Sequence, residues 1–288
     1  MKAKIADIVF QISSDQPLEL IHLEQSYRNF LCTEDAEITL FAKYDGLPQI
    51  SLHDKDRIFD SEMIWSLYRI DAKNVFVMKL PALDMRPYRI AVFDTDFKRG
   101  VVYNYVTIPE HPTDGCLPNP LEFPLSEVLM VSLLSKGRGL MVHSCGIDDK
   151  GKGYLFAGNS THGKTTMARL WTDEALTLND DRIVIRYKEG RFWMYGTPWH
   201  GDYTGVSPKG VPVEKLFFLQ HAMSNNVIKR NGADAASMFL TRCFPPLWDD
   251  EGMRFTLDLC SKLVEIVPCY TLDFRPDKSI IDFVRCAN

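Results

Sequence analysis

An eight-residue segment in the middle of the chain constrains its fold and chemistry more than any other feature. Residues 158–165 read Gly-Asn-Ser-Thr-His-Gly-Lys-Thr and match the phosphate-binding pattern G-x-x-x-x-G-K-S/T. A chain of ordinary composition and this length contains the pattern by chance roughly one time in a hundred. The pattern needs a strand before it and a helix after it, because the N–H groups at a helix N-terminus attract phosphate. Tyr154–Ala157 and Thr165–Trp171 are suited to these roles, so the sequence predicts a P-loop.

Each part of this loop has a physical role in phosphate binding. The two glycines let the backbone close around an anion, Lys164 can reach the β- and γ-phosphates, and Thr165 can offer its hydroxyl to Mg²⁺. The imidazole of His162 is more typical of a tolerated loop position than of a catalyst. The predicted nucleotide-binding residues are Gly158, Asn159, Ser160, Thr161, His162, Gly163, Lys164, Thr165 and Thr166.

Two adjacent acids, Asp180 and Asp181, follow the short apolar run Leu176–Asn179. We expect this run to be a strand that returns after one helix and lies beside the loop strand, which would bring a carboxylate close to the metal and the γ-phosphate. One acid could then hold Mg²⁺ through water while the other accepts a proton. The alternative is a solvated turn, because Asn-Asp-Asp is also turn composition.

A histidine comes close to the loop if Leu140–Ile147 and Gly153–Ala157 form a hairpin around residues 148–152. If Ile147 faces Gly153, antiparallel pairing places His143 opposite Ala157 and next to the loop. The imidazole there is either a functional group or a hydrogen-bonded structural residue. The aromatic and polar segment 195–202 is either a lip that binds an acceptor or a plain connection.

Composition and charge exclude several classes of protein. The formal net charge of −5 argues against a basic surface that would bind nucleic acid or an anionic membrane. No apolar run approaches the ~18 residues needed to span a bilayer, and Asp7 interrupts the apolar start where a signal peptide would need an unbroken run. The seven cysteines form no C-x-x-C pair. We therefore expect a cytoplasmic protein with reduced thiols.

Patterning predicts two domains. Residues 1–108 form a β-rich N-terminal domain, residues 109–124 contain five prolines and suit an extended connection, and residues 125–288 mix strands and helices. The predicted fold class is α/β, with a mixed β-sheet core that contains the P-loop and is flanked by helices. Expected N-terminal strands are Ile5–Ile12, Glu37–Lys43, Val75–Leu80, Tyr88–Phe93 and Gly100–Val106. Expected helices are Leu125–Lys136, Gly163–Trp171, Asp234–Phe244, Glu251–Val267 and Lys278–Arg285.

The set formed by His143, the loop 158–165 and the acid pair resembles the catalytic domain of the HPr kinase/phosphorylase family and, more distantly, ATP-dependent phosphoenolpyruvate carboxykinases. The motifs cover about 139–185. The resemblance implies that Lys164 and the loop amides hold ATP and that Thr165 ligates Mg²⁺. It also implies that Asp180 assists the metal, that Asp181 takes a proton from a Ser or Thr hydroxyl, and that His143 is an electrostatic partner at the γ-phosphate. The family's Arg-Gly-Leu-Gly signature is absent, and 196–202 occupies that region.

These features favour an ATP- and Mg²⁺-dependent phosphotransferase whose acceptor is a hydroxyl on a protein or peptide. Three cations are available to stabilise the transferred group, namely Arg182, Lys209 and Arg230. A nucleotide-gated binding protein, in which the loop 196–210 closes on a partner, is a second interpretation. Simple ATP hydrolysis is a third. The sequence leaves open the acceptor, the direction of the reaction and whether the chain forms a homo-oligomer.

Overall fold

The computed structural model describes residues 1–80, 83–105 and 116–287. The chain divides into two compact units, Met1–Leu133 and Leu134–Asn288. Helix α2 (Leu125–Leu134) ends at this division. Of the proline-rich segment 109–124, residues 109–115 lie outside the described residues. Within the described ranges, no helix combines the length and apolar character needed to cross a bilayer.

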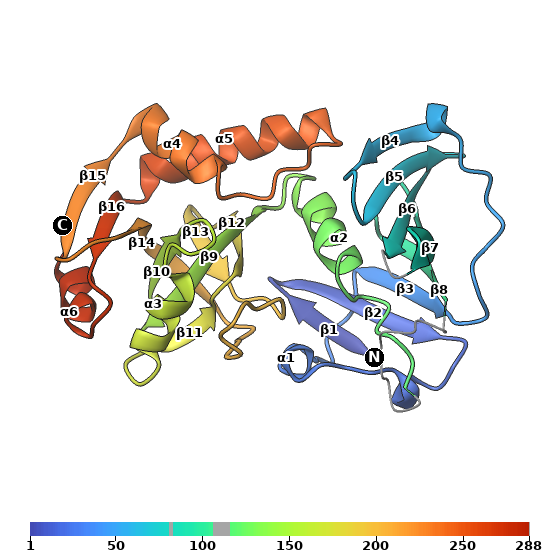
Figure 1. The fold of residues 1–288 in the computed structure, drawn as a ribbon, viewed down its shortest axis with the longest axis horizontal. Helices are drawn as coiled ribbons and strands as arrows, with labels where there is room; N and C mark the ends of the chain where they lie inside the picture. Colours follow the sequence, from blue (N-terminus) through green and yellow to red (C-terminus); the bar gives the residue numbers. More distant parts are fainter. Residues whose placement is uncertain (81–82, 106–115, 288) are drawn as a thin grey trace. The chain divides into compact units, whose positions relative to one another are not determined.

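The first unit contains a mixed sheet whose described strands follow the order β1-β2-β3-β8-β7-β6-β5-β4 (Figure 1). The β2–β3 and β3–β8 pairs are parallel and the others are antiparallel. The predicted single strand Ile5–Ile12 is wrong, because Ala6 (φ 51°) and Asp7 (φ 59°) turn the chain there. The elements are β1 (Lys2–Ile5), β2 (Ile8–Ser14), η1 (Leu18–Leu20), α1 (Gln25–Arg28), β3 (Ile38–Lys43), η2 (Asp54–Asp56), β4 (Arg57–Asp60), β5 (Trp65–Ile70), β6 (Lys73–Leu80), β7 (Arg86–Phe93) and β8 (Arg99–Asn104).

The second unit contains another mixed sheet, with its described strands in the order β10-β9-β12-β13-β14-β16-β15. Since β14 also pairs with β10, the pairings among β9, β12, β13, β14 and β10 form a closed ring. The strands are β9 (Leu140–Asp149), β10 (Lys152–Ala157), β11 (Leu176–Asn179), β12 (Arg182–Lys188), β13 (Arg191–Tyr195), β14 (Gly210–His221), β15 (Asn226–Arg230) and β16 (Cys269–Phe274). The helices are α3 (Lys164–Trp171), α4 (Gly232–Leu240), α5 (Asp250–Ile266) and α6 (Ser279–Cys286). The chain is thus a mixed α/β protein.

The hairpin that carries the loop strand has a different register from the predicted one. Asp149 pairs with Lys152 and Ser144 pairs with Ala157, so the predicted pairing of His143 with Ala157 is wrong. The cause is a two-residue turn at positions 150 and 151, whose φ values of 56° and 91° are typical of a tight type I′ hairpin. His143 lies one residue before Ser144, and its carbonyl accepts a hydrogen bond from the amide of residue 158 at 3.4 Å.

The strand that carries the two acids does not lie beside the loop strand, which corrects a second expectation. β11 has its predicted bounds, but it pairs antiparallel with β9, with Asn179 opposite Gly146. The same Gly146 faces Leu155 of β10, so β9 lies between β10 and β11. The other edge of β10 is occupied by β14 in parallel. The strand that carries the two acids is therefore separated from the loop strand by β9, whereas the sequence predicted that the two strands would be neighbours.

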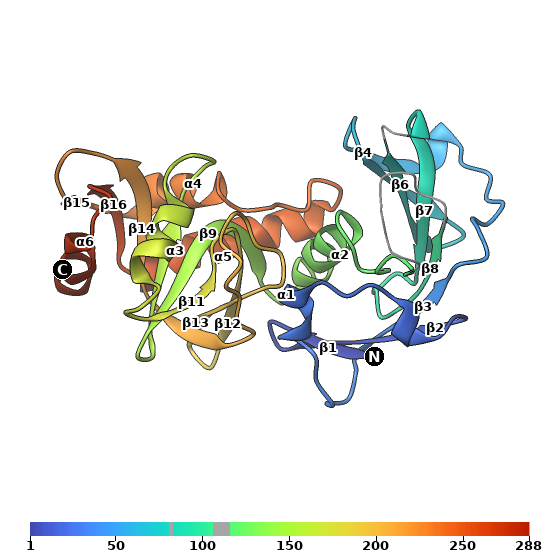
Figure 2. The same cartoon turned by 60° about the horizontal axis from the view of Figure 1, so that its bottom comes forward.

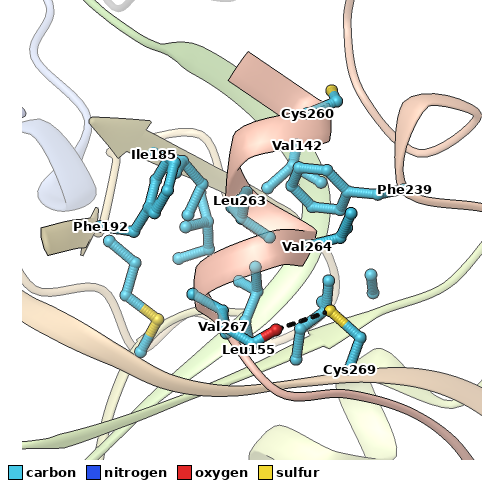
Figure 3. Packing of buried hydrophobic residues seen from close by; sticks show 14 of the residues in the cluster. Val142, Leu155, Ile185, Phe192, Phe239, Cys260, Leu263, Val264, Val267 and Cys269 are labelled. Atoms are coloured by element: carbon cyan, nitrogen blue, oxygen red, sulfur yellow. Dashed lines mark hydrogen bonds between the residues drawn. The ribbon is translucent and has the colours of Figure 1, made fainter. Parts of the chain in front are cut away.

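Helices pack on both faces of the second unit's sheet. Along β10, Phe156 belongs to the apolar cluster that includes α3 and α6, whereas Leu155 belongs to the cluster that includes α4 and α5. Figure 2 shows α3 against β9 and β11. Within the cluster that includes α4 and α5, Figure 3 shows Leu263 of α5 close to Val142 of β9. A strand buried on both faces is held firmly, so the loop that follows β10 starts from a fixed position.

Candidate functional site

The predicted phosphate-binding loop joins β10 to α3. β10 ends at Ala157 and α3 begins at Lys164. Thr161 (φ 71°) and Gly163 (φ 93°) have left-handed backbones, and such residues among right-handed ones create concave groups of N–H donors that bind anions. A Cβ atom at Gly163 would lie 2.5 Å from Cζ of Phe274, so glycine is required there. The loop thus has the local geometry of an anion site at the N-terminus of α3.

Lys164 is buried at the base of this loop. Its Nζ donates a hydrogen bond to the Asn159 carbonyl at 3.1 Å, so the side chain folds back across the loop. Burial lowers the pKa of Lys164 more than the nearby carboxylates of Asp181 and Asp180 raise it. A buried ammonium with incomplete compensation favours the approach of an anion.

Thr165 and Asp180 form a hydrogen-bonded pair of oxygen groups beside the loop. Thr165 Oγ1 donates a hydrogen bond to Asp180 Oδ2 at 2.8 Å. The same carboxylate accepts hydrogen bonds from the amides of Gly201 (2.8 Å) and Tyr203 (3.1 Å). A Cβ atom at Gly201 would lie 3.1 Å from Asp180 Oδ2, which makes glycine the residue that permits this approach.

These two oxygen groups suit Mg²⁺ better than a metal ion whose ligands all come from the protein. Across residues 1–80, 83–105 and 116–287, no group of three or more His, Cys, Asp or Glu side chains could hold a metal ion. Mg²⁺ usually binds one or two protein oxygens and takes its other ligands from phosphate and water. The hydroxyl of Thr165 and the carboxylate of Asp180 are such a donor set.

Asp181 is held by a histidine and an arginine. His143 Nε2 lies 2.8 Å from Asp181 Oδ1, and the Arg182 guanidinium forms an ion pair with Asp181 Oδ2. Burial alone would raise the pKa of Asp181, but the His143 hydrogen bond and the Arg182 charge outweigh it, so the pKa lies below its usual range. Arg182 also stacks on Phe244, with 4.5 Å between the guanidinium carbon and the ring centroid. Asp181 is therefore an oriented, ionised carboxylate at neutral pH.

Asn179 was not recognised from the sequence as a functional residue, yet it organises the acid pair. Its buried Oδ1 accepts hydrogen bonds from the amides of Asp181 (2.6 Å) and Arg182 (2.8 Å). Its Nδ2 donates to the carbonyls of Thr197 (2.9 Å) and Trp199 (3.1 Å). One side chain thus fastens the acidic turn to the segment 195–202. The turn-forming character of asparagine was the available sequence signal.

Arg242 is a second residue that sequence reasoning missed. Its Nη1 donates to the Met238 carbonyl and to Thr241 Oγ1, both at 2.7 Å. Its buried Nε has no hydrogen-bond partner among the residues that the structure describes. Among the described residues, no carboxylate forms an ion pair with this guanidinium, and burial lowers its pKa. A half-buried arginine with an unused donor indicates a place for an anion.

The backbone brings Arg242 to the loop. Its carbonyl accepts a hydrogen bond from the His143 amide at 2.7 Å. Its guanidinium lies 5.6 Å from the ring centroid of Phe218, the residue that pairs with Ala157. Its charge also contributes to the lowered pKa of His162, after the larger effect of burial. No local sequence pattern signals this contact, because it depends on how the segment after α4 joins β9.

The other two predicted cations lie elsewhere. Lys209 forms an ion pair with Asp148, five residues along β9 from His143, which is about 17 Å in a strand. Arg230 on β15 donates to Thr271 Oγ1 at 2.9 Å. Its strand is three strand positions from β10, about 14 Å across the sheet. Of the three predicted cations, Arg182 is the one beside the acid pair.

Comparisons with known proteins give a distant similarity of fold to solved structures. No protein-family model matches the sequence, and no curated protein matches it. Among solved structures, the Hpr(Ser) kinase/phosphatase from Coxiella burnetii aligns with 50% of this chain and 93% of its own, at 10% sequence identity and a TM-score of 0.31. Such a score indicates only a distant resemblance of fold, so the chemistry of the site has to be inferred from its own geometry.

Proposed function

We propose that this protein is an ATP- and Mg²⁺-dependent phosphotransferase that acts on a hydroxyl group of a protein or peptide. The observation that carries the proposal is the hydrogen bond between Thr165 and Asp180 at the start of α3, with the ionised Asp181 next in the chain. An anion loop, a magnesium-type ligand pair and an oriented base are the parts that phosphoryl transfer requires.

Binding is divided between the loop and the two cations near it. The loop amides, Lys164 and Arg242 hold the phosphate groups of ATP in this proposal, because both side chains are partly or fully buried without a fully compensating carboxylate. Thr165 and Asp180 hold Mg²⁺. The metal supplies positive charge that neutralises the phosphate oxygens.

Asp181 acts as the base. The acceptor oxygen forms a bond to the γ-phosphorus, the bond from that phosphorus to the β–γ bridging oxygen breaks, and ADP leaves with the electron pair. The hydroxyl proton passes to Asp181. His143 and Arg182 fix the direction of the carboxylate, and their positive or hydrogen-bonding groups keep it ionised until the proton arrives.

One observation favours a second candidate, the nucleotide-gated binding protein. The amides of Gly201 and Tyr203 are hydrogen-bonded to Asp180, the proposed magnesium ligand. A change in the partners of that carboxylate would therefore reach the loop 196–210 directly. In this case ATP would alter the loop without transfer of phosphate.

Incubation with γ-labelled ATP and a cell lysate separates the candidates. Label on a protein supports the phosphotransferase, free phosphate supports an ATPase, and unchanged ATP at saturating occupancy supports the nucleotide-gated protein. Lys164→Met should abolish ATP binding. Asp181→Asn should retain binding and reduce turnover by about 10²–10⁴-fold.

The matched control is Asp234→Asn on α4, which removes an exposed carboxylate that pairs with Arg230 away from the site. This variant should bind and react as the wild type does. Equal loss of ATP binding in Lys164→Met and Asp181→Asn would contradict the assignment of Asp181 as a base.

A further inference from the structure

His221 contacts the loop from outside the set of residues discussed so far. It is the last residue of β14 and pairs with Phe274, the last residue of β16. Its Nε2 lies 2.9 Å from the carbonyl oxygen of Thr161. Because a carbonyl oxygen only accepts hydrogen bonds, Nε2 must carry the hydrogen. The imidazole therefore donates a hydrogen bond to the tip of the loop.

The residue that receives this hydrogen bond has an unfavourable backbone conformation. Thr161 has a φ of 71°, and a β-branched residue is strongly disfavoured there. Asn159, Ser160 and Thr161 are exposed, so little packing holds this part of the loop. The bond to His221 is thus a specific contact that stabilises the left-handed turn.

The same imidazole packs against the other left-handed residue of the loop. The rings of His221 and Phe274 have centroids 5.1 Å apart. A Cβ atom at Gly163 would lie 3.0 Å from Cε1 of His221. Both left-handed residues of the loop are therefore in contact with the ends of β14 and β16.

We propose that His221 is a positioning residue that keeps the loop in its anion-binding conformation by hydrogen-bonding Thr161. The inference rests on the proposed nucleotide binding and adds a determinant outside the loop motif. The group that stabilises the loop is the N–H donor at Nε2 of His221. An imidazole donates from Nε2 in the neutral tautomer and in the protonated form, so the contribution does not require a positive charge.

Substitution of His221 tests the donor separately from the packing. His221→Leu keeps an apolar group against Phe274 and should raise the dissociation constant for ATP about three- to tenfold. His221→Gln places an amide donor near the position of Nε2 and should restore most of the affinity. Met223→Ser, at a 90% exposed neighbouring position, should bind ATP as the wild type does. The unfolding midpoints without nucleotide should stay close to the wild-type value in all three variants, since His221 and the tip of the loop are exposed and the loop can open locally without unfolding of the core.

A double-mutant cycle tests the role of the strained backbone. Thr161→Asn introduces a residue that tolerates the left-handed conformation, so His221→Leu should cost less affinity in that background than in the wild type. Additive effects would overturn the proposal, as would wild-type affinity in His221→Leu. Equal weakening by Leu and Gln would also overturn it, because restoring a hydrogen-bond donor would then have no effect. If the wild type itself does not bind ATP, the proposed function fails instead.

Discussion

Replacement of Asn179 by alanine should damage both the stability of the second unit and its site. The Asn179 side chain is fully buried and makes four hydrogen bonds to backbone groups at 2.6–3.1 Å. Two of them hold the amides of Asp181 and Arg182, and two hold carbonyls of Thr197 and Trp199. Alanine removes all four partners and leaves a cavity in their place.

The size of the effect follows from these contacts. Each of the four backbone groups that loses its partner costs about 0.5–1.5 kcal/mol, so the free energy of unfolding should fall by about 2–6 kcal/mol. For a unit of this size, each kcal/mol lowers the unfolding midpoint by about 2–4 °C, so the loss corresponds to about 4–24 °C. Urea denaturation followed by circular dichroism measures the first quantity, and calorimetry measures the second. ATP turnover should fall as well, because the acidic turn loses its anchor.

The matched control lies on the same strand. The buried hydroxyl of Thr177 has no hydrogen-bond partner in the described part of the chain, so Thr177→Val removes an unsatisfied group and changes little volume. This variant should be as stable as the wild type or more stable. A loss of less than about 1 kcal/mol in Asn179→Ala, or a similar loss in both variants, would refute the role assigned to Asn179.

Further predictions concern Arg242 and His162 at the loop. Arg242→Leu should weaken ATP binding by about tenfold. The free energy of unfolding should change by less than about 1 kcal/mol, because the loss of the two Nη1 hydrogen bonds is offset by the removal of a half-buried charge and an unsatisfied Nε. Unchanged affinity in calorimetry would contradict the assigned role. Burial and then the charges of Arg242, Lys164 and His221 lower the pKa of His162. The unfolded chain therefore binds the extra proton, and stability without nucleotide should decrease as the pH falls below about 6.5. Bound phosphate should raise that pKa, so ATP binding should take up a proton, measurable by titration in buffers of different ionisation enthalpy; His162→Gln should lose the uptake.

The sequence was most informative where structure depends on local chemistry. Gly163 must be glycine for a backbone and packing reason, and α3 begins at the next residue. The bounds of β11 follow from a short apolar run that ends at turn-forming residues. Such features depend on a few neighbouring residues, so a sequence pattern can predict them.

Pairing between distant strands could not be read in the same way. The two-residue turn after Asp149 shifted the hairpin by one position, and an apolar pattern alone did not distinguish the two registers. Edge strand β15 was missed because two adjacent apolar residues, Val227 and Ile228, among five give no alternating hydrophobic signal. The contacts of Asn179, Arg242 and His221 join segments far apart in the chain. Their partners depend on tertiary packing, for which a single sequence carries no local signal.

Calorimetric titration of ATP into the purified chain, with and without Mg²⁺, tests the central claim most directly. The account predicts one nucleotide per chain, tighter binding when Mg²⁺ is present, and loss of binding in Lys164→Met. It also predicts that Asp180→Ala removes the advantage given by Mg²⁺. Absence of binding in the wild type, or equal affinity in the wild type and Lys164→Met, would contradict the account.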